Sequence, residues 1–159
     1  GDSEVGRRAL GYRSIVCDPN IADMKDILNS KVKFREWYRP FAPFCKKEEA
    51  HKYFDSPNFE NLEYMSYAPR VKVDTLPSIT HVDGTARPQT VTEKSHSHFY
   101  ELLTEFGKIS ETNVLLNTSF NIRGYPILST IDDALYALNN TDMDHVVIED
   151  YLFTKREVQ

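Results

Sequence analysis

Apolar residues recur at helical spacing in two long segments of the second half of the chain. The first predicted helix starts at Ser95 or Ser97 and ends at Gly107. Its apolar face consists of Phe99, Leu102, Leu103 and Phe106. The second starts at Thr130, because the run Thr-Ile-Asp-Asp resembles a capping box. Its apolar face consists of Ile131, Ala134, Leu135 and Leu138.

Shorter segments complete the pattern. Two short helices are predicted, one after Asp18-Pro19 and one over residues 46–53. Strands are predicted over residues 62–73, 80–91, 113–116 and 145–153, with a turn at Gly84 inside the second of these. Strands and helices alternate in the second half, so we predict an α/β fold with a mixed sheet. The length of 159 residues fits one domain.

The first residues of the chain and its two cysteines bear on where the protein resides and on which classes of protein are excluded. The chain opens at Asp2 without an evident first element, so we expect a piece of a longer protein. Its polar first residues predict no signal peptide, and no run approaches the roughly 20 apolar residues of a membrane helix. Cys17 and Cys45 lie far apart without a CxxC pair, which favours a reduced, cytoplasmic protein without a zinc site.

Charge is unevenly distributed along the chain. The net charge of −5, from 19 basic and 24 acidic residues, argues against a general nucleic-acid binder. Residues 31–39 are nevertheless basic, whereas residues 129–150 contain acids but no Lys or Arg. Two interpretations remain open at this point: a binding site for one small anion, or ordinary solvated faces.

Four local patterns place polar residues and glycines where packing alone would not. The first is GRRALGYRS, from Gly6, which can offer backbone N–H groups and guanidinium groups to an anion. The second is KFREWYRPFAP, from Lys33, where aromatic rings alternate with cations and could stack a purine. The alternatives are a connecting loop for the first pattern and a core-anchored rim for the second.

The other two patterns lie later in the chain. HVDGTARPQ, from His81, combines a turn with Arg87, and a lone histidine is more often structural than catalytic. LLNTSFNIRG, from Leu115, runs from an apolar strand into hydrogen-bonding side chains, and strand ends of α/β sheets bind ligands. Turn capping is the alternative for its polar residues. Phosphate-loop, dinucleotide-binding and serine-hydrolase motifs are absent from the sequence.

Taken together and in this order, the four patterns resemble the C-terminal domain of the O-carbamoyltransferase family, which includes nodulation protein U and antibiotic-tailoring carbamoyltransferases. The matching runs are GRRALGYRSIVCDP, KFREWYRPFAP, THVDGTARPQTV and LLNTSFNIRGYPI. The family pattern has an aromatic residue after Glu4 and a proline before Arg8, where this chain has Val5 and Arg7. The resemblance covers nearly the whole chain.

The resemblance implies one half of a two-domain enzyme. Residues 1–159 would form a domain similar to the YrdC/Sua5 fold, a twisted open mixed sheet with flanking helices. This domain would take carbamoyl phosphate and ATP, with Mg²⁺, and form carbamoyl adenylate. A Kae1-like N-terminal domain of the same full-length chain would hold the metal of the transfer site and pass the carbamoyl group to a hydroxyl acceptor.

The resemblance also assigns roles to individual residues. It implies that Lys33, Arg87 and Ser119 are catalytic and that this domain holds no metal site of its own. The residues implied to bind the nucleotide or carbamoyl phosphate are Arg8, Lys33, Arg35, Arg39, Arg87, Ser119 and Asn121. Converging cations suit adenylation, which brings an anionic carbamate towards an anionic α-phosphate.

Two other functions remain open at the level of the sequence. One is a nucleotide- or RNA-binding module, which the acidic net charge disfavours. The other is a non-catalytic domain that only docks onto its partner domain. Neither a membrane nor a nucleic-acid partner is expected.

Overall fold

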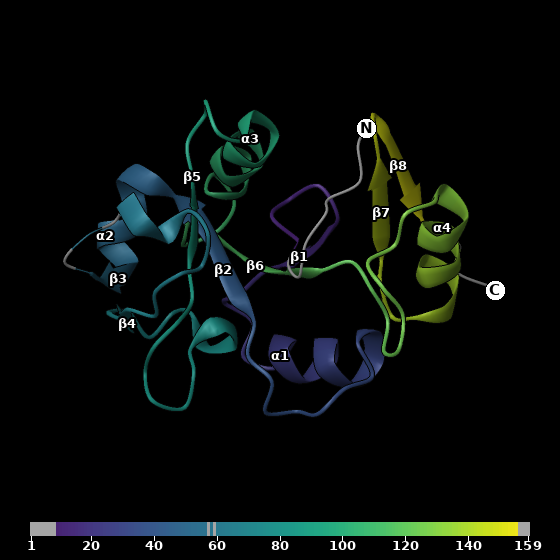
Figure 1. Cartoon of the computed structure of the whole chain (residues 1–159), viewed down its shortest axis with the longest axis horizontal. Coiled ribbons are helices and arrows are strands. Elements are labelled where there is room, and N and C mark those ends of the chain that lie inside the picture. Colours follow the sequence, from purple (N-terminus) through teal and green to yellow (C-terminus); the bar gives the residue numbers. More distant parts are fainter. Residues whose placement is uncertain (1–8, 57, 59, 156–159) are drawn as a thin grey trace.

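The computed structural model describes residues 9–56, 58 and 60–155. Its centre is a four-stranded sheet in the order β1-β6-β2-β5 (Figure 1). The strands are β1 (Ser14–Cys17), β6 (Val114–Ser119), β2 (Ala42–Lys46) and β5 (Gln89–Val91). β6 runs antiparallel to both neighbours, whereas β2 and β5 are parallel, so the sheet is mixed and open. The predicted α/β class with an open mixed sheet is confirmed.

Alternating side chains of the central strands build a hydrophobic core on each face of this sheet. On one face Phe44 of β2 and Leu115 of β6 pack with Phe99 and Leu103 of α3 (Ser97–Phe106). On the other face the alternate residues Cys45, Val114 and Leu116 pack with residues of the helical segments α1 (Met24–Ile27) and η1 (Leu28–Val32). This alternation follows from the two-residue repeat of a strand.

Short elements extend the core beside β2. They are η2 (Lys47–Glu49), α2 (Ala50–Tyr53), β3 (Phe54–Asp55), η3 (Glu60–Leu62), β4 (Arg70–Val71) and η4 (Pro77–Ile79). β3 and β4 pair as a small antiparallel sheet. Phe54, Leu76 and Ile79 are almost fully buried and anchor this region to the core under α1.

The last described elements, from residue 131 onwards, form a separate layer. α4 (Ile131–Asn140) packs on the hairpin of β7 (His145–Ile148) and β8 (Tyr151–Thr154), with Val146 buried between them (Figure 1). The predicted capping box at Thr130 is confirmed, because Thr130 and Asp133 exchange side-chain and backbone hydrogen bonds. An ion pair of 3.2 Å between Lys31 and Asp142 ties this layer to η1.

Several predicted elements are shorter than the apolar pattern indicated. Within residues 62–73 the strand is only Arg70–Val71, and within 80–91 it is only Gln89–Val91, with an isolated β-bridge between Thr85 and Arg70. The turn at Gly84 is present, with φ at +77°, and Asp83 Oδ1 accepts from the Thr85 amide at 3.0 Å. These local hydrogen bonds satisfy backbone groups that a strand would otherwise pair.

Two further boundaries differ from the prediction. The first helix begins at Met24 because Asp18 Oδ1 accepts from the Asn20 amide at 2.9 Å and holds a turn. Residues 145–153 form two strands instead of one, and the hairpin turns at Glu149, whose φ is +53°.

The described part of the chain contains no helix that is both long and apolar enough to cross a membrane. Both cysteines are free thiols, Cys45 buried and Cys17 half-buried. Burial, with Asp144 and Asp18 nearby, raises the pKa of Cys17 to about 12, so this thiol stays protonated at neutral pH.

Candidate functional site

The buried Lys33 ammonium organises the end of β6. Its Nζ donates to the carbonyl oxygens of Ser119 at 2.7 Å and Asn121 at 2.8 Å, and to Asn121 Oδ1 at 2.5 Å. The Ser119 hydroxyl donates to the same Asn121 Oδ1 at 2.7 Å. The structure therefore joins three of the predicted site residues in one hydrogen-bonded unit. Lys33 is only 4% exposed, and its hydrogen bonds fix the backbone of residues 119–121 from the protein interior.

An irregular helical turn delivers Lys33 to this position. η1 is a π-helix, and the Lys33 amide donates to the Leu28 carbonyl at 2.7 Å. The chain then leaves the helix through Phe34, whose φ of +49° is uncommon for a residue with a side chain. Single π-turns and left-handed residues concentrate at functional sites.

Burial changes the proton affinity of Lys33. Removal from water lowers the pKa of Lys33 from 10.5 to about 7, and the positive charge of Arg35 adds to the decrease. The three acceptor oxygens favour the ammonium form and oppose this decrease. The amine is therefore poised to gain or lose a proton near neutral pH.

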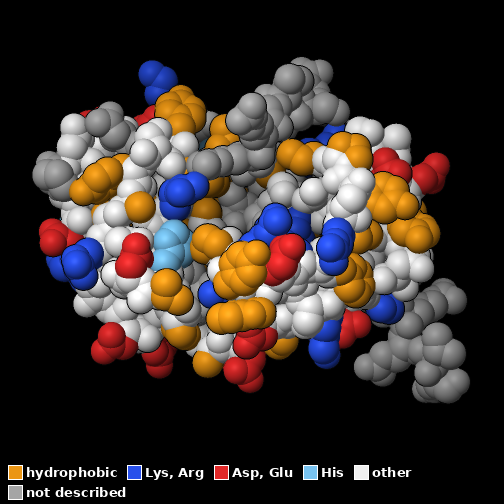
Figure 2. Space-filling model, turned by 60° about the horizontal axis from the view of Figure 1, so that its bottom comes forward, with side chains coloured by type: hydrophobic (Ala, Val, Ile, Leu, Met, Phe, Trp, Pro, Cys, Tyr) orange, Lys and Arg blue, Asp and Glu red, His pale blue; other side chains and the backbone are white. Residues whose placement is uncertain are grey.

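A cleft of about 210 Å³ opens beside this unit. Arg35, Arg87 and Ser119 all line it, and they come from three different predicted motifs. Ala9 of the first motif lines it as well. Figure 2 shows Lys and Arg side chains gathered near the centre of one face of the molecule, beside exposed hydrophobic side chains. The fold thus converges segments that are up to 110 residues apart in sequence, from Ala9 to Ser119.

The two guanidinium groups of the cleft differ in how firmly they are held. Arg35 Nε donates to Asn29 Oδ1 at 2.7 Å, and its guanidinium lies 4.5 Å from the centre of the Phe41 ring. Arg87 is exposed and forms no ion pair within the described part of the chain. The cleft is therefore lined by one cation that the protein holds in place, Arg35, and one that is free to bind a ligand, Arg87.

Arg39 occupies a different position from the other predicted cations. It forms an exposed ion pair of 2.8 Å with Glu36 and is not among the described residues that line the cleft. Arg8 lies outside the described residues. Its neighbour Ala9 is bonded into the site, because its carbonyl accepts from Asn117 Nδ2 at 3.2 Å.

Two polar atoms of the cleft are buried without a hydrogen-bond partner in the described structure: Asn117 Oδ1 and His81 Nε2. Asn117 is 2% exposed. Burial lowers the pKa of His81, and Arg87 adds to this effect while Asp83 opposes it. Buried polar atoms normally have partners, so these two atoms suit a bound ligand or ordered water.

Sequence reasoning missed the role of Asn29, a buried residue of η1. Its Nδ2 donates to the carbonyls of Trp37 and Arg39, each at 3.2 Å, while its Oδ1 holds Arg35. One amide side chain thus fixes the course of the whole second motif. A polar residue at a position of the helix that faces the core was the signal that could have revealed it. For Asn117, ligand binding and turn capping were both left open, and His81 was interpreted as a structural histidine.

Gly11 permits a close approach that keeps the first motif against the sheet. Its φ is +126°, and a Cβ atom built there would lie 2.3 Å from His96 Nε2. The adjacent Tyr12 ring stacks on His96 with 4.5 Å between ring centres. Only glycine fits this backbone conformation and this contact.

An open mixed sheet with a basic cleft at the end of a central strand defines an α/β domain of the kind that binds ligands at strand ends. The family model described as "Carbamoyltransferase C-terminus" matches residues 1–155. The chain belongs to this family, which confirms the resemblance inferred from the four motifs.

Curated relatives of this chain are much longer proteins. Nodulation protein NolO of Bradyrhizobium diazoefficiens is 44% identical over 98% of this chain and 29% of its own length. Nodulation protein U of Rhizobium tropici is 39% identical over 99% of this chain and 27% of its own length. The 3'-hydroxymethylcephem-O-carbamoyltransferase of Amycolatopsis lactamdurans is 36% identical over 99% and 30%, respectively. The chain spans less than a third of the length of these relatives.

Proposed function

We propose that this domain forms carbamoyl adenylate from carbamoyl phosphate and ATP within an O-carbamoyltransferase. Membership of the carbamoyltransferase C-terminal family and the name of one relative support carbamoyl transfer in general. The observation that carries the finer proposal is the convergence of Arg35, Arg87 and Ser119 on one cleft at the Lys33-bound turn. A YrdC-like fold and a Kae1-like partner domain belong to the same proposal.

The proposed chemistry has two steps. Water first splits carbamoyl phosphate into carbamate and phosphate. A carbamate oxygen then attacks the α-phosphorus of ATP, and the bond from that phosphorus to the bridging oxygen breaks. Carbamoyl adenylate and pyrophosphate are the products. Both reactants of the second step are anions, so the site must screen their repulsion and stabilise the charge that develops on pyrophosphate.

The described residues divide this work by their geometry. Arg87 and Arg35 face the cleft with guanidinium groups, which match phosphate and carboxylate oxygens in a bidentate fashion. Ser119 lines the cleft at the end of β6 and offers its hydroxyl there. Lys33 and Asn121 are not among the described residues that line the cleft; they hold this strand end in place through their hydrogen bonds, and Lys33 adds positive charge. Asn117 Oδ1 is left to accept a hydrogen bond from the ligand, and His81 Nε2 accepts or donates according to its tautomer.

The test is release of pyrophosphate from ATP by this chain, with and without carbamoyl phosphate. We expect release that depends on carbamoyl phosphate and is inhibited by added pyrophosphate. We also expect no carbamoylation of an alcohol by this chain alone, because the acceptor site belongs to the preceding domain in the proposal. Release of pyrophosphate that does not depend on carbamoyl phosphate contradicts the proposed adenylation. A carbamoylated alcohol contradicts the proposal that the transfer step belongs to the preceding domain.

Ligand binding should be accompanied by proton uptake at Lys33. Burial lowers the pKa of this amine to about 7, so above neutral pH it loses its proton and can then donate to only two of its three acceptors. A bound polyanion stabilises the ammonium and raises its pKa, so binding at pH 8 takes up a proton and at pH 6 takes up little. Calorimetric titration in two buffers of different ionisation enthalpy measures this uptake. Equal heats in both buffers at pH 8 would rule out a proton change.

A further inference from the structure

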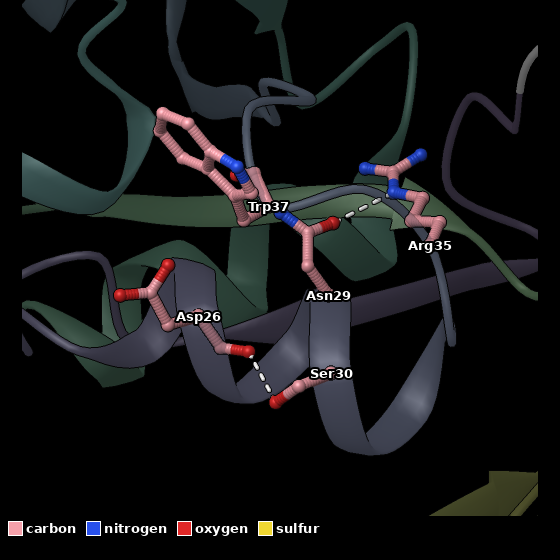
Figure 3. Close-up of a pocket in the computed structure, with 5 residues that line it drawn as sticks. All are labelled: Asp26, Asn29, Ser30, Arg35 and Trp37. Atoms are coloured by element: carbon pink, nitrogen blue, oxygen red, sulfur yellow. Dashed lines mark hydrogen bonds between the residues drawn. The ribbon is translucent and has the colours of Figure 1, made fainter.

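A second cleft, of about 300 Å³, lies next to the proposed catalytic cleft, and the adenylation chemistry proposed above does not use it. Its five described lining residues are Asp26, Asn29, Ser30, Arg35 and Trp37. In Figure 3 the Trp37 indole lies at one side of this space and the Arg35 guanidinium at the other, with Asn29 between them. The Asp26 carboxylate lies on the same side as Trp37.

Trp37 is exposed to a degree that packing does not explain. Its side chain is 70% exposed, although tryptophan is among the most buried residues on average. Its described ring contact is an edge-on one with Tyr38, at 6.0 Å and 83°, which leaves indole face available. An exposed indole is the best stacking surface that a protein offers to a planar aromatic ligand.

The segment that carries Trp37 is held in place. Asn29, 1% exposed, bonds the Trp37 carbonyl, the Arg39 carbonyl and the Arg35 Nε. The backbone below the indole is therefore tied to a buried side chain of η1. Such support lowers the conformational entropy that binding would otherwise cost.

Charge distinguishes the two clefts. Arg35 lines both and so connects them. Asp26 lines only the second cleft, and its carboxylate disfavours a phosphate there but accepts hydrogen bonds from hydroxyl or amino groups. The first cleft has Arg87 in addition to Arg35 and suits anionic groups. A ligand with a neutral aromatic end and an anionic end would match both clefts with Arg35 between them.

We propose that the Trp37 cleft is a nucleoside subsite. The purine stacks on Trp37, ribose hydroxyls or the exocyclic amine meet Asp26, and the phosphates cross Arg35 into the cleft of Arg87 and Ser119. This inference rests on the proposed use of ATP, to which it adds the place and orientation of the nucleotide.

Trp37 is itself a reporter for this site, because it is the single tryptophan of the chain. We expect ATP and AMP to change its fluorescence in a saturable way, with a midpoint that matches the calorimetric dissociation constant. Tripolyphosphate, which has no base, should bind calorimetrically without this change. Calorimetric ATP binding that leaves Trp37 fluorescence unchanged overturns the inference alone. Failure of ATP to bind overturns the proposed function as well.

Paired variants separate stacking from general damage. Trp37→Ala should weaken ATP binding about tenfold, the scale of one aromatic–base stack, and leave tripolyphosphate binding unchanged. Trp37→Phe should retain most of the affinity. Tyr38→Ala is the matched control, because Tyr38 is 60% exposed next to Trp37 but is not among the residues that line the cleft. Equal ATP affinities of Trp37→Ala and Tyr38→Ala contradict the subsite.

Discussion

Arg87→Ala is expected to reduce carbamoyl phosphate-dependent release of pyrophosphate by at least about a hundredfold, the scale of losing one preorganised group that stabilises transition-state charge. Arg87 is exposed, lines the cleft of about 210 Å³ to which adenylation is proposed, and forms no ion pair within the described part of the chain. Its removal leaves no protein group of that part unpaired. The melting temperature should therefore stay nearly unchanged while the rate falls.

Arg39→Ala provides the matched control for this variant. Arg39 belongs to the basic motif, but its guanidinium is engaged with Glu36 and is not among the described residues that line either cleft. We expect little change in rate from its removal. Arg87→Lys adds a second comparison, because a lysine keeps the charge but cannot form a bidentate contact. Rates for Arg87→Ala and Arg39→Ala that fall by the same factor would mean that only diffuse positive potential matters, and the cleft assignment would be wrong.

The sequence was most informative where a motif places polar groups directly after a strand. The apolar run that ends at Leu116 predicted a strand, and Ser119 and Asn121 were expected at its end for that reason. The helix Ile131–Asn140 was predictable from its capping box at Thr130, and the helix Ser97–Phe106 from its apolar face and its stop at Gly107, although its N-cap is His96 and not Ser95 or Ser97. In these cases the determinants lie within a few neighbouring residues.

Tertiary contacts determined the features that were missed. The strand Ser14–Cys17 has no hydrophobic alternation of its own and is stabilised by pairing with β6. Asn29 looks like an ordinary helical residue until its bonds to Arg35 and to the Trp37 carbonyl are known. Lys33 was predicted as one of several cations facing a ligand, but its Nζ is bonded to three acceptors of the β6 end and it is not among the described residues that line either cleft. Its burial and its three carbonyl acceptors depend on a segment 86 residues away.

Lys33→Ala is expected to lower the free energy of unfolding by about 3 kcal/mol, because it leaves two backbone carbonyls and Asn121 Oδ1 without their shared donor in a buried place. From charge alone, removal of one cation from a basic cluster would relieve repulsion and slightly stabilise the chain. The hydrogen bonds outweigh that gain because each unmet buried acceptor carries its own desolvation penalty. Denaturant unfolding of both proteins at pH 7 measures the difference.

Lys31→Ala is the control for Lys33→Ala, since Lys31 lies two residues away with 57% of its side chain exposed and forms a surface ion pair with Asp142. Little change in stability is expected there. A pH series then identifies the cause. The pKa of Lys33 is about 7 in the folded chain and 10.5 when unfolded, so the unfolded chain binds more protons between these values. This residue therefore makes the wild-type protein more stable as pH rises from about 7 to about 10, and Lys33→Ala should lack that increment. Parallel stability curves for the two proteins across this range would show that the lysine does not change protonation on unfolding.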